Sequence, residues 1–228
     1  MKILIVSATW LEVKLLSDEL EFIKESSHIL KHYRLEETEI DVLITGIGAT
    51  FTAFHLTNTL RDEKYQMVIN IGIAGSLTNE LSIGEVVTVT SDEFADLGIE
   101  KENEFLTLFE TGFMDANEFP FEQGILKSSD WNGLCHFRKV RGITTNKSHG
   151  RGSSIAEIKS KFTAQVESME GAVVFFVCNW LGVPCCQIRA ISNFVEPRDS
   201  SNWNIPLALE NLNGSVLDVL RRVAVEVN

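Results

Sequence analysis

The strongest constraint on the fold is a repeated alternation of short apolar runs, rich in β-branched residues, with longer amphipathic stretches. Such runs are typical of strands buried on both faces, and amphipathic stretches of helices that cover a sheet. The predicted strands are Lys2–Val6, Ile40–Thr45, Met67–Ile71, Ile83–Thr90 and Pro184–Ala190. The predicted helices include Leu11–Leu20, Ala49–Leu60 and Pro206–Val225. We therefore predict an α/β fold: a single domain over residues 1–228, with three α/β/α layers around a mixed central sheet.

The composition bounds the kind of protein and its partners. With 228 residues, 44% of them hydrophobic, the chain is long enough to bury a sizeable core. The 20 basic and 32 acidic side chains give a net charge of −12, which argues against nucleic acid or an anionic membrane as the main partner. No signal peptide is found, and no apolar stretch approaches the roughly 20 residues that span a bilayer. We expect a cytoplasmic protein.

The cysteines and histidines do not predict a metal site. Cys135, Cys178, Cys185 and Cys186 lack the paired spacing of zinc ligands, so we expect reduced thiols. The remaining histidines outside the motifs also show no ligand spacing: His28, His32, His55 and His136. We predict neither a metal nor a cofactor.

For three of the predicted helices, the sequence supports more specific predictions. In the first, Leu15, Leu16 and Leu20 are expected to share one side. Asn204 is placed to cap the last helix. A further helix, Glu170–Leu181, is apolar all the way round over Ala172–Cys178, so we expect it to be buried in the middle of the domain.

Two carboxylates stand at the start of that buried helix, Glu167 and Glu170. A carboxylate there is favoured by the helix dipole, by about 0.3–1 kcal/mol, so capping explains either residue. A carboxylate beside a wholly buried helix also costs desolvation energy unless it has a partner, and the hydroxyl groups of a ligand would be one. Both interpretations stay open.

The segment from Phe94 to Gly150 is the least regular part of the chain, mixing Gly, Asn, Phe and acidic residues. Such a segment is typical of a lid or pocket wall, and equally of ordinary surface loops. The sequence leaves both open.

Small or polar residues stand at the carboxyl ends of four predicted strands, where ligands bind in open α/β sheets. The four segments are Ser7–Glu12, Thr45–Gly48, Asn70–Ser76 and Arg189–Asn193. Their glycines are weak signals alone, because Gly46-Ile47-Gly48 lacks the third glycine of a dinucleotide fingerprint and no phosphate loop is present.

Together with Met169-Glu170-Gly171-Ala172, these segments resemble the nucleoside phosphorylase and nucleosidase superfamily, and in particular the methylthioadenosine/adenosylhomocysteine nucleosidases. The resemblance covers nearly the whole chain and is loosest over Phe94–Gly150. It implies a nucleoside phosphorylase-like fold and a small purine nucleoside as substrate. It also implies a homodimer in which the neighbour lends an apolar side chain to the pocket for the 5′ substituent.

The resemblance also implies roles for single residues. Glu12 matches the carboxylate that activates the attacking water; without the resemblance, a solvated residue in the first turn of a helix is the favoured interpretation. Glu170 matches the residue that holds the ribose 2′- and 3′-hydroxyls, and Met169 packs under the sugar. Glycosidic cleavage passes through an oxocarbenium-like sugar that nearby carboxylates stabilise, and a positioned base adds typically about 10²–10⁴-fold.

Three further residues and one histidine are expected at the same pocket. Ile73, Ala74 and Gly75 match substrate-binding positions of the superfamily. His149, in Thr145–Gly150, is a candidate to stack on the purine or to hydrogen-bond it. A histidine on a surface loop is an equal alternative.

Asn193 departs from the pattern of the adenine-cleaving relatives, which carry Asp there to help protonate the base at N7. Asparagine offers two N–H donors, which suit a 6-oxopurine with acceptors at O6 and N7. Hypoxanthine also leaves more readily as an anion than adenine does. We therefore predict an inosine-type substrate and a catalytic role for Asn193; the alternative is a turn residue after a strand.

The runs Val166–Ala172 and Phe194–Ile205 look like those of the futalosine hydrolases of menaquinone biosynthesis. Their substrate is an inosine that carries an aromatic carboxylate at the 5′ carbon. Arg198 is a candidate to bind that carboxylate bidentately, and equally to pair with Asp199 or Glu196. Trp203 is interpreted as a core or helix-staple residue rather than a substrate platform.

The predicted function is thus hydrolysis of futalosine to release hypoxanthine. A methylthioadenosine/adenosylhomocysteine nucleosidase is the first alternative. A phosphorylase is a second, although the Gly-Asp-Pro-x-Arg run of those relatives is replaced here by Ser7–Leu11. A non-catalytic nucleoside-binding module is a third, since fold does not fix function. The retained Glu12 and Glu170 argue against it.

Overall fold

A computed structural model describes residues 1–102, 104–131, 136–197 and 199–226. Its centre is a mixed sheet with the strand order β11-β10-β6-β12-β5-β1-β4-β3-β2. The inner strands are β1 (Lys2–Ser7), β4 (Thr38–Ile44), β5 (Met67–Ser76), β6 (Val86–Phe94), β10 (Arg138–Thr144), β11 (Val166–Ser168) and β12 (Cys185–Phe194). Strands β4, β1, β5 and β12 are parallel, whereas β12 runs antiparallel to β6. The predicted mixed sheet is confirmed.

Shorter strands lie at the margins of this sheet. The hairpin β2 (Glu21–Ser27) and β3 (Leu30–Leu35) extends it beyond β4, and β9 (Leu126–Lys127) pairs with β6. A separate two-stranded sheet is formed by β7 (Gly98–Glu100) and β8 (Phe105–Thr107). Strands β7 to β10 therefore lie within the segment that looked least regular in the sequence.

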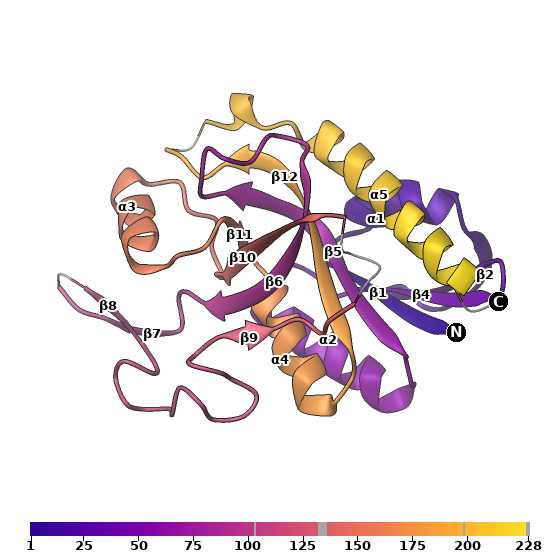
Figure 1. The fold of residues 1–228 in the computed structure, drawn as a ribbon, viewed down its shortest axis with the longest axis horizontal. Helices are drawn as coiled ribbons and strands as arrows, with labels where there is room; N and C mark the ends of the chain where they lie inside the picture. Colours follow the sequence, from indigo (N-terminus) through magenta and orange to yellow (C-terminus); the bar gives the residue numbers. More distant parts are fainter. Residues whose placement is uncertain (103, 132–135, 198, 227–228) are drawn as a thin grey trace.

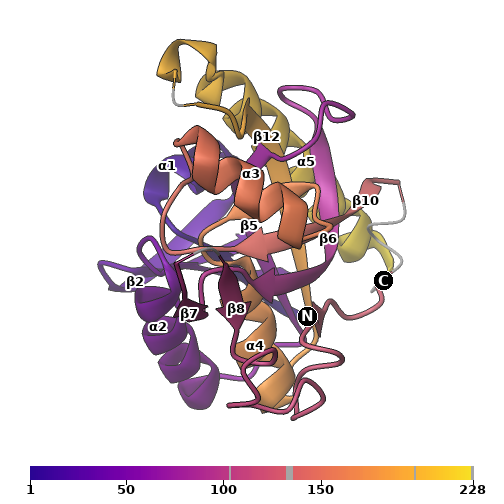
Figure 2. The ribbon, with the colours of Figure 1, turned by 90° about the vertical axis from the view of Figure 1, so that its left-hand side faces the viewer.

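Helices cover both faces of the sheet (Figure 1). Helices α1 (Trp10–Asp18) and α5 (Ile205–Glu226) pack together on one face, and α2 (Ala49–Asp62) and α4 (Gly171–Leu181) on the other. Helix α3 (Gly152–Lys161) lies beside β10 and β11, toward the viewer in Figure 2. The 3₁₀ helix η2 (Ser200–Asn202) precedes α5. The predicted three-layer α/β/α architecture is confirmed.

One half of the sheet closes on itself, and this closure positions the site. Strand β11 pairs with β10 on one side and antiparallel with β5 on the other, so β5, β12, β6, β10 and β11 form a ring. Gly75 of β5 pairs with Glu167 of β11 and with Asn193 of β12. Segments distant in the sequence thus meet at one end of β5.

Helix α4 is buried as its composition predicts. Val174 and Phe175 are fully inaccessible, and of Ala172–Cys178 only Phe176 is half-exposed. The helix ends at Gly182, whose φ of 67° lies in the left-handed region that glycine adopts without strain. The rigid start of this helix is where Glu170 stands.

The structure corrects some details of the predicted elements. Leu16 and Leu20 are buried, but Leu15 is 47% exposed, because adjacent helical residues point about 100° apart and only one of the two faces the core. Strand β6 begins at Val86 rather than Ile83, and β5 continues beyond Ile71 through the glycine-rich segment to Ser76. Asn204 does accept a bond from the Leu207 amide, as expected of a cap.

Candidate active site

A cavity of about 430 Å³ lies where β1, β5 and β12 end, next to the start of α4. It brings together most of the residues singled out in the sequence: Glu12, Ile73, Ala74, Gly75, Met169, Glu170 and Asn193. The start of α5 supplies a further, mainly apolar part of the wall, with Trp203, Ile205 and Leu209. We call this space the central cavity.

Glu12 is held by hydrogen bonds from three neighbours. Its Oε2 accepts bonds from the backbone N (3.0 Å) and hydroxyl (3.0 Å) of Thr9 and from Ser7 Oγ (3.2 Å). Its Oε1 accepts a bond from the backbone N of Ile73 (3.2 Å). The residue is only 8% exposed, so it is not a solvated residue of the first helical turn. The carboxylate is instead fixed in one orientation on the wall of the central cavity.

Glu170 stands at the N-cap position of α4, but its side chain does not cap the helix. Its Oε1 accepts a bond from the backbone N of Gly48 (2.9 Å), which belongs to the loop after β4. Burial raises the pKa of Glu170, the charge of Arg189 and the Gly48 amide oppose that shift, and the Glu12 carboxylate adds to it. The two carboxylates are therefore close enough to interact, and capping does not explain Glu170.

Arg189 was part of a predicted motif but had no assigned role. It is buried in β12, and a Cβ at Gly72 would collide with its Nη1 and lie 2.8 Å from Glu12 Oε1. The guanidinium Nε donates to Gln187 Oε1 (2.8 Å), whereas Nη2 has no hydrogen-bond partner among the described residues. Arginine is rarely buried without a partner, and the sequence signal for its role was a charged residue inside a strand that is predicted to be buried.

Asn193 is reached through a register shift between β12 and β5 at Ile191–Asn193. Such a bulge re-aims side chains, and here Asn193 lines the central cavity. Its Oδ1 accepts a bond from Ser192 Oγ (2.8 Å) and its Nδ2 donates to the Phe194 carbonyl (2.9 Å). One of the two predicted N–H donors is thus used within the loop, which leaves one for a ligand.

His149 lies apart from the central cavity. It lines a neighbouring polar cavity of about 290 Å³, and its ring Nδ1 is hydrogen-bonded to Glu167. The Glu167 side chain also accepts a bond from the His149 amide (3.0 Å) and lines the central cavity itself. The structure therefore places Glu167, not His149, on the cavity wall, and Glu167 is explained by this pairing rather than by capping.

Two further sequence interpretations concern the stretch before α5. Trp203 lines the central cavity just before the start of α5. Arg198 lies outside the described residues. Over the part of the chain that the structure describes, no group of three or more His, Cys, Asp or Glu residues is placed to hold a metal ion. No described helix is long and apolar enough to cross a membrane.

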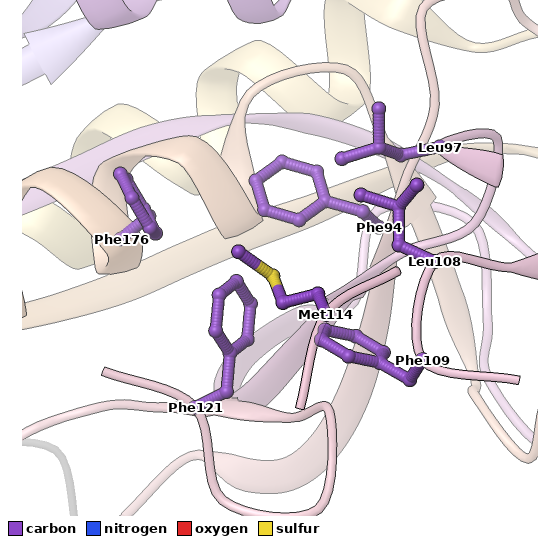
Figure 3. Close-up of a pocket in the computed structure, with 7 residues that line it drawn as sticks. All are labelled: Phe94, Leu97, Leu108, Phe109, Met114, Phe121 and Phe176. Atoms are coloured by element: carbon purple, nitrogen blue, oxygen red, sulfur yellow. The ribbon is translucent and has the colours of Figure 1, made fainter. Parts of the chain in front are cut away.

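A second cavity, of about 220 Å³, is lined only by apolar side chains (Figure 3). One comes from the end of β6, five from the segment between β6 and β9, and one from α4: Phe94, Leu97, Leu108, Phe109, Met114, Phe121 and Phe176. We call it the apolar cavity. Part of the Phe94–Gly150 segment is therefore packed over α4 rather than looped freely over the surface.

Comparison with known proteins places the chain in a family. The family model described as "Phosphorylase superfamily" matches residues 2–221. The chain belongs to the phosphorylase superfamily. The superfamily resemblance and the nucleoside phosphorylase-like fold predicted from the sequence are confirmed.

Curated relatives of two kinds match most of the chain. A futalosine hydrolase of Streptomyces coelicolor is 31% identical over 181 residues, covering 77% of this chain and 76% of the relative. A 5′-methylthioadenosine/S-adenosylhomocysteine nucleosidase of Glaesserella parasuis is 29% identical over 202 residues, covering 84% of each chain. Among solved structures, the native futalosine hydrolase of Helicobacter pylori has a TM-score of 0.81 at 20% identity, covering 97% of this chain and 98% of its own.

Proposed function

We propose that this chain is a nucleosidase that hydrolyses the N-glycosidic bond of futalosine and releases hypoxanthine, as a step of menaquinone biosynthesis. The observation that carries the proposal is the placement of Glu12 and Glu170 on the wall of one cavity, both buried and close enough to interact. The futalosine hydrolases and nucleosidases among the relatives support it. No cofactor is required for this reaction.

Glu12 is suited to act as the general base for the attacking water. Its carboxylate is anchored by the bonds from Thr9, Ser7 and Ile73, so its orientation does not have to be acquired during the reaction. A base fixed in this way contributes typically about 10²–10⁴-fold to the rate. As the glycosidic bond lengthens, the sugar gains positive charge, and a preorganised carboxylate stabilises that charge.

Glu170 and Met169 suit the ribose. The carboxylate of Glu170 is bound on one oxygen by the Gly48 amide, and the remaining acceptor capacity is available for the 2′- and 3′-hydroxyls of a sugar. Met169 lies beside it on the cavity wall and offers an apolar surface to the sugar ring. Arg189 adds a positive charge that keeps two neighbouring carboxylates compatible in one buried site.

Asn193 suits the base of a 6-oxopurine nucleoside. Its free N–H can donate to O6 or N7 of hypoxanthine, whereas an adenine presents a donor amino group at the 6 position. Because hypoxanthine is the better leaving anion, a hydrogen bond replaces full proton transfer. The apolar wall of Trp203, Ile205 and Leu209 matches the aromatic group of the 5′ substituent, and Arg198 is proposed as a partner for its carboxylate.

A methylthioadenosine/adenosylhomocysteine nucleosidase is the second candidate. It is favoured by the Glaesserella relative, which matches a larger share of this chain than the Streptomyces futalosine hydrolase does. The same apolar wall would accept a methylthio group. The two candidates share Glu12 and Glu170 and differ at the base, so Asn193 is the residue that favours futalosine.

We also propose that the protein acts as a homodimer. Ile47 and Leu11 line the central cavity yet are 54% and 60% exposed, so the cavity is open on their side. Phe51 and Phe54 continue this exposed apolar surface along α2. A contiguous apolar surface of this kind is typical of an interface, and a second copy of the chain would cover it and complete the pocket.

Incubation of the purified protein with futalosine, methylthioadenosine, adenosylhomocysteine and inosine, followed by chromatography of the released base, tests the proposal. We expect hypoxanthine from futalosine at the highest kcat/KM. A clear preference for the adenine nucleosides would replace futalosine by the second candidate. Binding without release of any base would overturn the nucleosidase itself.

A further inference from the structure

A buried carboxylate behind the central cavity has no part in the mechanism above. Asp92, on β6, is inaccessible to solvent and does not line the cavity. Its Oδ1 accepts a bond from Thr144 Oγ1 (3.0 Å) and its Oδ2 one from Gln187 Nε2 (3.1 Å). Both partners donate, so Asp92 is the shared acceptor of two chains of hydrogen bonds that run in different directions.

The first chain leads to Glu12. Gln187 donates to Asp92 through its amide nitrogen, and its amide oxygen accepts a bond from Arg189 Nε (2.8 Å). Asn70 Nδ2 donates to the same oxygen (3.4 Å). The guanidinium held in this way lies beside Gly72, next to the Glu12 carboxylate. The position of the positive charge near Glu12 therefore depends on the orientation of the Gln187 amide.

The second chain leads to Glu170. Thr144, whose hydroxyl donates to Asp92, accepts a bond on the same oxygen from the backbone N of Ala172 (2.7 Å). Ala172 is in the first turn of α4, two residues after Glu170. The backbone that carries Glu170 is thus tied to Asp92 through one side chain.

Two glycines make room for this arrangement. A Cβ at Gly171 would collide with Asp92 Oδ2 and with the amide of Gln187, and one at Gly142 would lie 2.8 Å from Asp92 Oδ2. The network and the start of α4 therefore pack too closely for any larger residue at these two positions. Burial raises the pKa of Asp92 to about 7, although the bonds from Gln187 and Thr144 and the charge of Arg189 oppose the shift.

We propose that Asp92 is a positioning residue: it fixes both Arg189 and the start of α4. Through them it sets the placement of Glu12 relative to Glu170. A buried polar network of this kind is a poor way to gain stability, because well-packed apolar residues of the same volume do as well or better. This inference rests on the function proposed above, since it concerns the same two carboxylates.

The two chains of bonds predict different kinetic effects. Gln187→Met removes the bridge to Arg189 and should lower kcat by about 10- to 100-fold with little change in KM, since misplacing a reacting group by an ångström costs on that order. Thr144→Val frees the start of α4 and should mainly raise KM, because Glu170 is proposed to hold the ribose. Thr88→Val is the matched control: Thr88 is a buried threonine on β6 whose hydroxyl donates to the backbone carbonyl of Gln187, so its removal leaves the side-chain bonds of Gln187 to Asp92 and Arg189 in place.

Rescue distinguishes positioning from a merely structural role. Asp92→Asn leaves one amide oxygen for the two donors Thr144 and Gln187, so one of the two chains of bonds breaks, with donor against donor at Gln187 when the oxygen faces Thr144. Adding Gln187→Glu restores a donor facing an acceptor and moves the negative charge next to Arg189 Nε. We expect D92N to lose kcat by about 10- to 100-fold and D92N/Q187E to recover at least about tenfold of it.

Kinetics of the wild type and these variants on the substrate that the wild type turns over fastest, with circular dichroism and thermal unfolding of each, form the test. An inactive wild type overturns the proposed function and this inference with it. An active wild type with D92N and Q187M as active as T88V overturns the inference alone. So does a D92N/Q187E variant no more active than D92N although it is folded, or a loss of activity that follows thermal stability in all variants.

Discussion

The central cavity and the apolar cavity use the same helix in opposite ways. The central cavity meets α4 at its start, where Glu170 is exposed to the ligand space and tied to the Gly48 amide. The apolar cavity meets α4 further along, at Phe176, among side chains without a charge (Figure 3). In the central cavity, polar groups are fixed by hydrogen bonds to specific partners. In the apolar cavity, the packing of apolar side chains is adaptable and includes a methionine.

The difference indicates that the central cavity serves chemistry and the apolar cavity serves stability. Around Glu12, buried polar groups are held by specific hydrogen bonds that an apolar core does not need. Around Phe121, the centroids of three aromatic rings lie within 6.4 Å of the centroid of its own ring. These contacts bury apolar surface and involve no polar group. Substitutions in the first region should therefore change turnover, and those in the second the free energy of unfolding.

The largest effect is expected at Glu12. Glu12→Gln keeps the size of the side chain but removes the base, so kcat should fall by about 10²–10⁴-fold. Its loss of stability should stay within about 1–3 kcal/mol, the cost of imperfect hydrogen bonds at a buried site. Steady-state kinetics and thermal unfolding measure the two. The matched control is Glu19→Gln at the other end of α1, which is exposed and should leave kcat unchanged; near-normal turnover of E12Q would contradict the mechanism.

In the apolar cavity, Phe121→Ala should lower the free energy of unfolding by about 3–5 kcal/mol, because it removes a buried ring from a cluster of three others. The kcat of the folded fraction should not change. Denaturant unfolding measures the loss, with Phe113→Ala, a 74% exposed ring in the same segment, as the control expected within about 0.5 kcal/mol of wild type. A kcat that falls at temperatures where F121A is folded would show that the two cavities are coupled.

The pH dependence of stability should report on Asp92. Its pKa is raised from 3.8 to about 7 in the folded protein, so between these values the folded state holds a proton that the unfolded state has released. The contribution of Asp92 to the free energy of unfolding is therefore fully present below about pH 4 and is lost as the pH rises to about 7. The loss is on the order of 4 kcal/mol, at about 1.4 kcal/mol per pH unit. Glu170 and Glu93, whose pKa values are also raised by burial, act with the same sign.

Denaturant unfolding of wild type and Asp92→Asn across this pH range checks the assignment. The free energy of unfolding of D92N should fall less steeply with pH than that of the wild type, but it should still fall, because Glu170 and Glu93 still titrate. Glu93→Gln provides the comparison from the neighbouring residue on β6. An unchanged slope in D92N would show that Asp92 is ionised throughout the range.

The smallest of these effects concerns the base. Asn193→Asp replaces the free N–H donor by a carboxylate that can share a proton with N7, so the ratio of kcat/KM for adenine over hypoxanthine release should rise about tenfold, the value of one hydrogen bond of about 1.4 kcal/mol. A matched pair of adenosine and inosine with the same 5′ group measures this ratio. An unchanged ratio would remove Asn193 as the residue that selects the base.

Much of the fold follows from local sequence signals. Strands β1, β4, β5 and β12 and helices α1, α4 and α5 each bury apolar residues in a pattern that can be recognised without knowing their neighbours. Helix α2 buries only Thr52 and Leu56 and leaves Phe51 and Phe54 exposed. The hairpin strand β2 could not be predicted in this way, because every residue from Glu21 to Ser27 is exposed and its strand conformation depends on pairing with β3. The three-residue strand β11 likewise depends on Gly142 and on Gly75, distant in the sequence.

The site was predictable to a similar extent. The resemblance to the superfamily placed Glu12, Met169, Glu170 and Asn193, and the structure brings these four together. Arg189 and Asp92 were missed as functional candidates, because the groups that a buried polar residue contacts depend on which strands lie beside it. The pairing of His149 with Glu167 beside the neighbouring cavity could not be predicted for a related reason, because the sequence does not show on which side of its loop the ring lies.

The most direct test of the nucleosidase is the origin of the oxygen in the sugar product. Wild-type protein would be incubated with futalosine in water enriched in the heavy oxygen isotope, with and without phosphate, and the products analysed by mass spectrometry. We predict hypoxanthine and a free sugar without sugar phosphate, formed at the same rate in both buffers. In products quenched before the open-chain form exchanges oxygen with water, the label should lie on the anomeric hydroxyl. A sugar phosphate, a rate that requires phosphate, or no release of base would contradict hydrolysis at Glu12.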